Sequence, residues 1–181
     1  TGLGRDAGTY CFMVGVGRYE DQAFAVRQYF MPDYGHEAAL LDLVREELEQ
    51  ASGLVSFNGR AFDLPLLKTR YRMQCSELPG RDLPHLDLLL AARRLWRNSL
   101  DSCALSSLET ELLGVLRAQN DIPGYLIPQV YNDYVQFGDV LPIADVFYHN
   151  EVDILSMVTL LHLIGRVMET LQRLGLDDDT I

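Results

Sequence analysis

Hydrophobic and polar positions along the first fifty residues follow two different periods. Residues 9–19 and 23–30 are rich in β-branched and aromatic side chains, and only the polar residues 20–22 separate them. Two such runs joined by a short polar connection predict a β-hairpin. In residues 36–51 the apolar side chains recur every three or four residues, with acidic side chains between them. This spacing predicts an amphipathic helix.

Short apolar runs then alternate with helical patterns. Residues 54–57 and 85–89 predict two buried strands, and helices are predicted to follow them over residues 64–73 and 90–97. Pro65 is tolerated in the first turn of a helix. A hairpin followed by helices that alternate with buried strands predicts an α/β domain. We expect a mixed central sheet flanked by helices.

The C-terminal half is predicted to be helical. Ser-Ser-Leu-Glu at residues 106–109 matches a capping box, and the short helix that it begins is expected to stop at Gly114. Further helices are predicted over residues 128–137 and over about 149–174, and the second is much the longer.

Composition describes one globular domain. The chain has 181 residues, of which 48% are hydrophobic. We place the domain at residues 1–176 and interpret residues 177–181, which begin with three aspartates, as the start of a linker. The longest nearly apolar run, residues 154–164, is shorter than the roughly 18 residues of a membrane span, so no membrane partner is expected. Three widely spaced cysteines fit a reducing, cytoplasmic setting.

Charge is distributed unevenly along the chain. The net charge of −11 argues against a nucleic-acid partner, yet residues 58–100 hold eight basic and four acidic residues, a net +4 that leaves −15 elsewhere. Fourteen of the fifteen basic residues are arginine, the side chain best suited to bidentate phosphate contacts. The segment is therefore either a phosphate-binding surface or an ordinary solvated helix face.

The stretch FNGRAFDLPLL, residues 57–67, places Asp63 at a strand-to-helix junction. Ligands of open α/β folds gather at this edge of a sheet. Asp is also a favoured N-cap, and the preceding Asn58-Gly59 is a good turn former. Asp63 is thus a candidate ligand or a helix cap.

The stretch FYHNEVD, residues 147–153, places His149 and Asp153 four residues apart. On a helix they share one face, whereas Glu151 points away from both. An imidazole beside a carboxylate suits a general base next to a metal ligand, and a surface pair is the alternative. Asp87 shares a strand face with His85, which suits either a supporting role or a structural one.

Several longer stretches carry a family resemblance. They are GTYCFMVGVG, LVSFNGRAFDLPLL, HLDLLLAARRLW, ALSSLETELLG, DIPGYLIPQVYNDY and FYHNEVDILSM. Together and in this order they resemble the ribonuclease H-like 3′–5′ exonucleases of the DEDD superfamily, and within it the YprB-type family. The resemblance implies a ribonuclease H-like fold and three acidic motifs, D-x-E-T-T-G-L, N-x-x-x-F-D, and a Tyr or His shortly before an Asp.

Two of these motifs are present. Asn58 to Asp63 forms the second and Asp153 belongs to the third, whereas the first remains only as Thr1-Gly2-Leu3. Because the chain begins without a methionine, we expect the Asp and Glu of the first motif just upstream of Thr1, so that the domain lacks its N-terminal strand. The family pairs His with four intervening residues and Tyr with three. Here the types are exchanged, which leaves both His149 and Tyr148 as candidates for the base, although helical geometry favours His149.

The resemblance implies a two-metal hydrolase of DNA or RNA. Asp63 and Asp153 would hold two Mg²⁺ or Mn²⁺ ions, which activate water and stabilise the leaving 3′ oxygen, and His149 would take the proton of the water. A single strand or a 3′ end would be the partner. The residues expected to contact it are Thr1, Gly2, Leu3, Asn58, Phe62 and Tyr148.

The sequence also allows other interpretations of the function. The exchanged His and Tyr and the acidic balance favour a non-catalytic nucleic-acid-binding or scaffolding module. A metal-dependent hydrolase of small phosphoesters is a third reading. The resemblance also implies helical repeats after this domain in a full-length chain.

Overall fold

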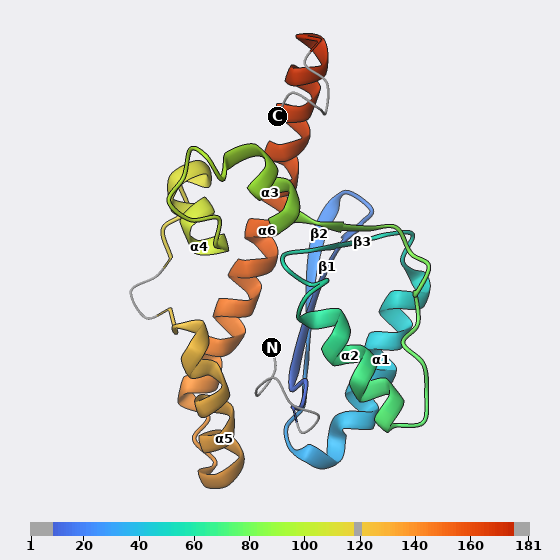
Figure 1. Cartoon of the computed structure of the whole chain (residues 1–181). Helices are drawn as coiled ribbons and strands as arrows, with labels where there is room; N and C mark the ends of the chain where they lie inside the picture. The colour runs from blue at the N-terminus through green and yellow to red at the C-terminus, as the bar shows by residue number, and fades with distance from the viewer. Residues whose placement is uncertain (1–8, 118–120, 176–181) are drawn as a thin grey trace.

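A computed structural model describes residues 9–117 and 121–175, and it is an α/β structure of small sheets and helices (Figure 1). Four strands are present in the described residues: β1 (Met13–Glu20), β2 (Ala23–Phe30), β3 (Leu54–Ser56) and β4 (His85–Asp87). The main helices are α1 (Glu37–Gln50), α2 (Asp63–Met73), α3 (Leu88–Trp96), α5 (Ile127–Phe137) and α6 (Leu141–Arg173). Shorter turns are η1 (Tyr34–His36), α4 (Leu105–Leu108), η2 (Glu109–Leu113) and η3 (Gly124–Leu126).

The predicted hairpin is confirmed. β1 pairs antiparallel with β2 over their whole lengths, from Met13 opposite Phe30 to Glu20 opposite Ala23. α1 is tied to this hairpin through Glu47, which accepts hydrogen bonds from Arg27 (2.9 Å) and Tyr29 (2.5 Å). The helix predicted at 36–51 is therefore present and lies against the first sheet.

The two short strands form a second sheet. β3 and β4 are parallel, with Ser56 opposite Asp87. The mixed central sheet expected from the sequence is not observed in the described residues, where the four strands form two separate two-stranded sheets. In a single mixed sheet, β1 and β3 would be joined by hydrogen bonds. Here residues of both strands line a common cavity instead.

Two hydrophobic cores hold these layers together. The first gathers the hairpin, α1, α2 and α5 around the buried rings of Phe12, Tyr71 and Tyr131, and the Phe12 and Tyr131 rings stack at 4.1 Å. The second lies between α3 and the later turns of α6, around Leu88 and Leu160. Because α6 contributes to both cores, its position is fixed relative to both sheets.

α6 is longer than the sequence predicted. It begins at Leu141 rather than near residue 149, because Pro142 in its first turn needs no backbone N–H partner there. With 33 residues it is long and apolar enough to cross a membrane by length and composition alone. In this structure its buried residues, among them Val146 and Leu160, pack in the two cores.

The capping box prediction was wrong. α4 begins at Leu105 with Ala104 as its N-cap residue, so Ser106 lies inside the first turn. Ser102 accepts the Ala104 N–H instead (3.1 Å). The predicted stop is confirmed, because Gly114 adopts φ +64°.

Candidate functional site

One large cavity is lined by all three of the predicted catalytic residues. It has a volume of about 1560 Å³, and Asp63, His149 and Asp153 all line it. Asp63 comes from the start of α2, and the other two come from α6. Segments about ninety residues apart thus supply one site.

The loop before α2 sets the position of Asp63. Asn58 adopts φ +61°, and a Cβ on Gly59 would lie 2.5 Å from Ser56 Oγ, so the turn needs a glycine there. Asp63 is the first residue of α2, and the N-cap is Phe62, which makes no side-chain capping bond. Within the described part of the chain, the Asp63 carboxylate forms no hydrogen bond or ion pair. It is therefore not a cap, and it faces the cavity.

Asp87 holds this loop from the neighbouring strand. Its buried carboxylate accepts the N–H groups of Asn58 (2.7 Å) and Arg60 (3.1 Å), and it also caps α3 through Leu89 N (3.2 Å). Of the two roles considered for Asp87, the structural one is observed. It fixes the turn that carries the second acidic motif.

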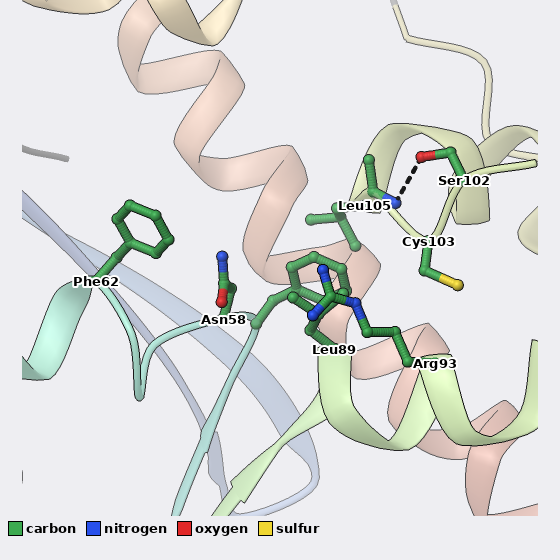
Figure 2. Close-up of a pocket in the computed structure, with 9 residues that line it drawn as sticks. Asn58, Phe62, Leu89, Arg93, Ser102, Cys103 and Leu105 are labelled. Atoms are coloured by element: carbon green, nitrogen blue, oxygen red, sulfur yellow. Dashed lines mark hydrogen bonds between the residues drawn. The ribbon is translucent and has the colours of Figure 1, made fainter. Parts of the chain in front are cut away.

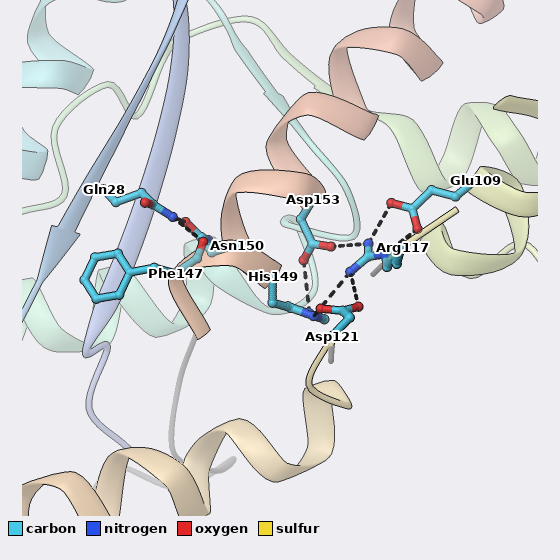
Figure 3. Close-up of polar contacts among 8 residues, drawn as sticks. All are labelled: Gln28, Glu109, Arg117, Asp121, Phe147, His149, Asn150 and Asp153. Carbon is cyan, nitrogen blue, oxygen red and sulfur yellow. Dashed lines mark hydrogen bonds and ion pairs between the residues drawn. The ribbon is translucent and has the colours of Figure 1, made fainter. Parts of the chain in front are cut away.

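The hairpin sets the position of α6. Glycines at positions 15 and 17 of β1 let α6 approach the strand closely. A Cβ at position 15 would clash with Asn150 and Ile154, and a Cβ at position 17 would clash with Ile154. Gln28 Nε2 donates to Phe147 O (2.7 Å) and to Asn150 Oδ1 (3.0 Å), as Figure 3 shows. These contacts turn the face with His149 and Asp153 toward the cavity.

His149 rather than Tyr148 lies beside Asp153. His149 Nε2 is 3.5 Å from Asp153 Oδ2, whereas Tyr148 is not among the residues that line the cavity. The early start of α6 explains this, because both His149 and Asp153 lie well inside the helix and share one face.

An arginine that the sequence reading did not single out sits at the centre of the site (Figure 3). Arg117 Nη2 donates to Asp153 Oδ1 at 2.5 Å, and Nη1 donates to Asp121 Oδ2 at 3.1 Å. Its Nε and Nη2 form a bidentate pair with Glu109 at 2.6 Å each. Asp121 Oδ1 also lies 3.0 Å from His149 Nδ1. One guanidinium group therefore joins three carboxylates, and two of them, Asp121 and Asp153, also lie beside the imidazole. Arg117 Nη1 itself is 3.2 Å from His149 Nδ1.

Burial and nearby charges shift the pKa values of the groups in this cluster in opposite directions. Burial raises the pKa of Asp153 above its ordinary value, and the hydrogen bond from Arg117 and the nearby His149 offset only part of that rise. Burial lowers the pKa of Arg117, but its bonds to Glu109 and Asp153 outweigh burial, and the net pKa is raised. Arg117 therefore remains a permanent cation in the site.

Only indirect evidence in the sequence pointed to Glu109 and Asp121 as partners of Arg117. Glu109 was assigned to a capping box, yet its side chain is 1% exposed and paired with Arg117. Asp121 lies in DIPGYLIPQVYNDY, a stretch that carried the family resemblance without a role for that residue. Neither follows a helical or strand spacing relative to Asp153, so only the tertiary structure brings them together.

The residues expected to contact nucleic acid fall into three groups. Asn58 and Phe62 line a second, smaller cavity next to the first (Figure 2). Tyr148 lines neither of the two cavities. Thr1, Gly2 and Leu3 lie outside the described residues.

Comparison with known proteins identifies the family. Residues 1–164 match the model of the RNase_H superfamily. The chain belongs to the RNase_H superfamily. It is also 37% identical over 170 residues to "Uncharacterized protein YprB" of Bacillus subtilis (strain 168). That match covers 93% of this chain and 41% of the relative, so the chain spans about two fifths of the length of the relative. RNase_H-superfamily proteins in general hydrolyse nucleic acids and typically use divalent metals.

The residues present fit a divalent metal in type. Carboxylate oxygens are the ligands that Mg²⁺ and Mn²⁺ prefer, and the pairing of Arg117 with Asp153 shows that this position favours a positive charge. Among the described residues, no group of three or more His, Cys, Asp or Glu side chains is arranged to hold an ion. Asp63 and Asp153 would thus supply part of the coordination, with the rest coming from water or from residues outside the described ranges.

Proposed function

We propose that this chain is the catalytic domain of a metal-dependent 3′–5′ exonuclease that hydrolyses phosphodiester bonds of DNA or RNA. The observation that carries the proposal is the common cavity of Asp63, His149 and Asp153 in a chain of the RNase_H superfamily. The 3′–5′ direction rests on the resemblance to the DEDD exonucleases.

Asp63 and Asp153 would hold Mg²⁺ or Mn²⁺, which supplies activation of the attacking water and charge stabilisation at the leaving oxygen. His149 is placed to act as the general base. His149 Nδ1 lies 3.0 Å from Asp121 Oδ1 and 3.2 Å from Arg117 Nη1, and Nε2 lies 3.5 Å from Asp153 Oδ2. In the tautomer whose Nδ1–H donates to Asp121, Nε2 carries the lone pair that a general base needs. A base in this position accepts a proton from water in the cavity.

One observation favours the alternative of a non-catalytic nucleic-acid-binding module. Arg117 already neutralises Asp153 at 2.5 Å, as an internal cation would in a site that has lost its metals. The same fold would then bind a strand without cutting it.

Hydrolysis of labelled single strands separates these functions. The chain is incubated with 5′-labelled and 3′-labelled oligonucleotides in Mn²⁺, beside Asp63→Asn, Asp153→Asn and the control Asp139→Asn at an exposed position. We expect the 5′-labelled strand to shorten stepwise and the 3′ label to be released as a mononucleotide, with activity lost in the first two variants only. Equal cleavage by all four proteins would remove Asp63 and Asp153 from the site. Binding without cleavage would establish the alternative.

A further inference from the structure

Arg117 is held at one edge of its guanidinium group and faces the large cavity with the other. Nε and Nη2 form the bidentate pair with Glu109, which is 1% exposed and is not among the residues that line the cavity. Arg117 and Asp153 both line the cavity, and Nη2 also donates to Asp153 (Figure 3). A buried carboxylate therefore fixes a cation in the wall of the proposed active site.

The donors of Arg117 that Glu109 does not use lie among the proposed catalytic groups. A guanidinium group has five N–H donors, of which Glu109 takes two. The other three belong to Nη1 and Nη2, which lie 2.5 Å from Asp153, 3.1 Å from Asp121 and 3.2 Å from His149 Nδ1. A divalent ion ligated by Asp153 competes with Nη2 for that carboxylate, because the two cations repel each other. The Nη2–H group displaced from Asp153 then needs another anionic acceptor.

The charge of the cluster decides when an anion can bind at Arg117. Glu109, Asp121 and Asp153 place three carboxylates around one guanidinium group, so in the absence of metal the cluster repels an anion. With a divalent ion held by Asp153, the local balance becomes positive. A phosphate group is then the acceptor that suits the freed N–H groups, because its oxygens match the fork of an arginine.

We propose that Arg117 is a catalytic residue that binds the scissile phosphate through the N–H group that here donates to Asp153. The inference rests on the proposed function, because it takes the substrate to be a phosphodiester bound beside Asp63 and Asp153. Negative charge on the oxygens of a transferring phosphoryl group is stabilised by a fixed cation in contact with them. Arg117 thus neutralises Asp153 in the absence of metal and contacts the substrate in its presence.

Strand binding with and without a divalent ion tests this contact without relying on hydrolysis. Fluorescence anisotropy follows a 5′-labelled ten-residue oligothymidylate as it binds to the 181-residue chain, in EDTA and in Ca²⁺, which also prefers oxygen ligands. Gel electrophoresis checks that the strand stays intact. The test variant is Arg117→Met/Glu109→Gln, which keeps the net charge and leaves no buried carboxylate unpaired.

The chain offers a matched control for this variant. Arg70 and Glu37 form a second buried bidentate pair, at 2.5 and 2.6 Å, and neither residue is among those that line the two cavities. Arg70→Met/Glu37→Gln therefore removes the same groups from a different part of the fold. Arg117→Lys is a second test variant, because it keeps a positive charge opposite Glu109 but lacks the fork.

We expect Arg117→Met/Glu109→Gln to bind the strand as the unmodified chain does in EDTA, and about tenfold more weakly in Ca²⁺. The slope of log K against log salt in Ca²⁺ should become shallower by about 0.7, as for one lost phosphate contact. Hydrolysis in Mn²⁺ should fall about hundredfold, although the affinity for Mn²⁺ itself should not fall. The control should change strand affinity less than about twofold, and Arg117→Lys should retain part of the affinity gained in Ca²⁺.

Four outcomes would overturn the inference: an unchanged strand affinity of the double variant in Ca²⁺, equal losses in EDTA and Ca²⁺, equal losses in the control, or no binding of the strand at all. The proposed function fails in a different way. Strand affinity that depends on Arg117 in Ca²⁺, combined with no hydrolysis by the unmodified chain in Mn²⁺, would reject the exonuclease and keep the phosphate contact.

Discussion

Arg117 and Asp153 form a 2.5 Å ion pair inside the cavity proposed as the active site, and the same guanidinium group is anchored by Glu109. Glu109 is 1% exposed, so its charge has no access to water. Because Arg117 bonds to both carboxylates, the stability of the loop after η2 depends on the charge of Asp153, a proposed metal ligand.

Removal of Arg117 should destabilise the protein strongly. Arg117→Met leaves the buried Glu109 carboxylate without its partner, which should lower the free energy of unfolding by about 3–5 kcal/mol in urea denaturation. The double variant Arg117→Met/Glu109→Gln should recover most of that loss, because no uncompensated charge then remains. Arg166→Met, at an exposed position of α6, is the control. Equal losses for Arg166→Met and Arg117→Met would contradict the role of the buried pair.

Metal binding should compete with Arg117. A divalent cation at Asp153 approaches a carboxylate that a guanidinium group already neutralises, so the double variant Arg117→Met/Glu109→Gln should bind Mn²⁺ about tenfold more tightly. Electron paramagnetic resonance of free Mn²⁺ measures this affinity without any substrate. In an Asp153→Asn background the gain should disappear. An unchanged or weaker affinity in the double variant would show that Arg117 supports the metal site instead of competing with it.

Gly59 should be required for the loop that carries Asp63. Gly59→Ala places a Cβ 2.5–2.6 Å from the Ser56 side chain, and overpacking of this kind lowers the free energy of unfolding by about 1–3 kcal/mol. Gly165→Ala is the matched control, because nothing lies within 4 Å of a Cβ there, and in α6 it should stabilise by about 0.5–1 kcal/mol. Thermal unfolding of both variants measures the contrast. Equal shifts in Tm would show that the close approach to Ser56 is easily relaxed.

Glu47 should make stability depend on pH in the acid range. Burial raises its pKa, but hydrogen bonds from Tyr29 and Arg27 outweigh burial, so its pKa in the folded protein lies below the ordinary 4.5. A carboxyl group with a lowered pKa stabilises the fold above its unfolded pKa, and the stabilisation is lost as the pH falls through the folded pKa. Glu47→Gln should therefore cost about 1–3 kcal/mol at pH 7 and progressively less below pH about 4.5.

Urea denaturation between pH 2.5 and 7 measures this difference. Glu49→Gln, whose side chain is 58% exposed, serves as the control and should show little loss at any of these pH values. A loss for Glu47→Gln that stays constant down to pH 2.5 would mean that packing, rather than ionisation of Glu47, holds α1 against the hairpin.

The local pattern determined most of the elements. The β-branched and aromatic content of residues 13–30 and the helical spacing of residues 37–50 are properties of short stretches of chain, and the hairpin and the helix formed close to where they were predicted. The start of α6 lies eight residues before the predicted one, and Pro142 is accommodated in its first turn. The helix caps considered at Asp63 and Ser106 are not observed. A residue type that is favoured at caps does not by itself determine where a helix begins.

The sequence by itself determined the candidate pair of His149 and Asp153, because four residues on a helix place two side chains on one face. Family resemblance added Asp63. Only the tertiary structure decided that these residues share a cavity, that Asp87 serves the loop rather than the cavity, and that Arg117 lies on Asp153. The physical reason is that charge pairing between distant segments depends on how buried groups find partners in three dimensions, and no short-range period records that choice.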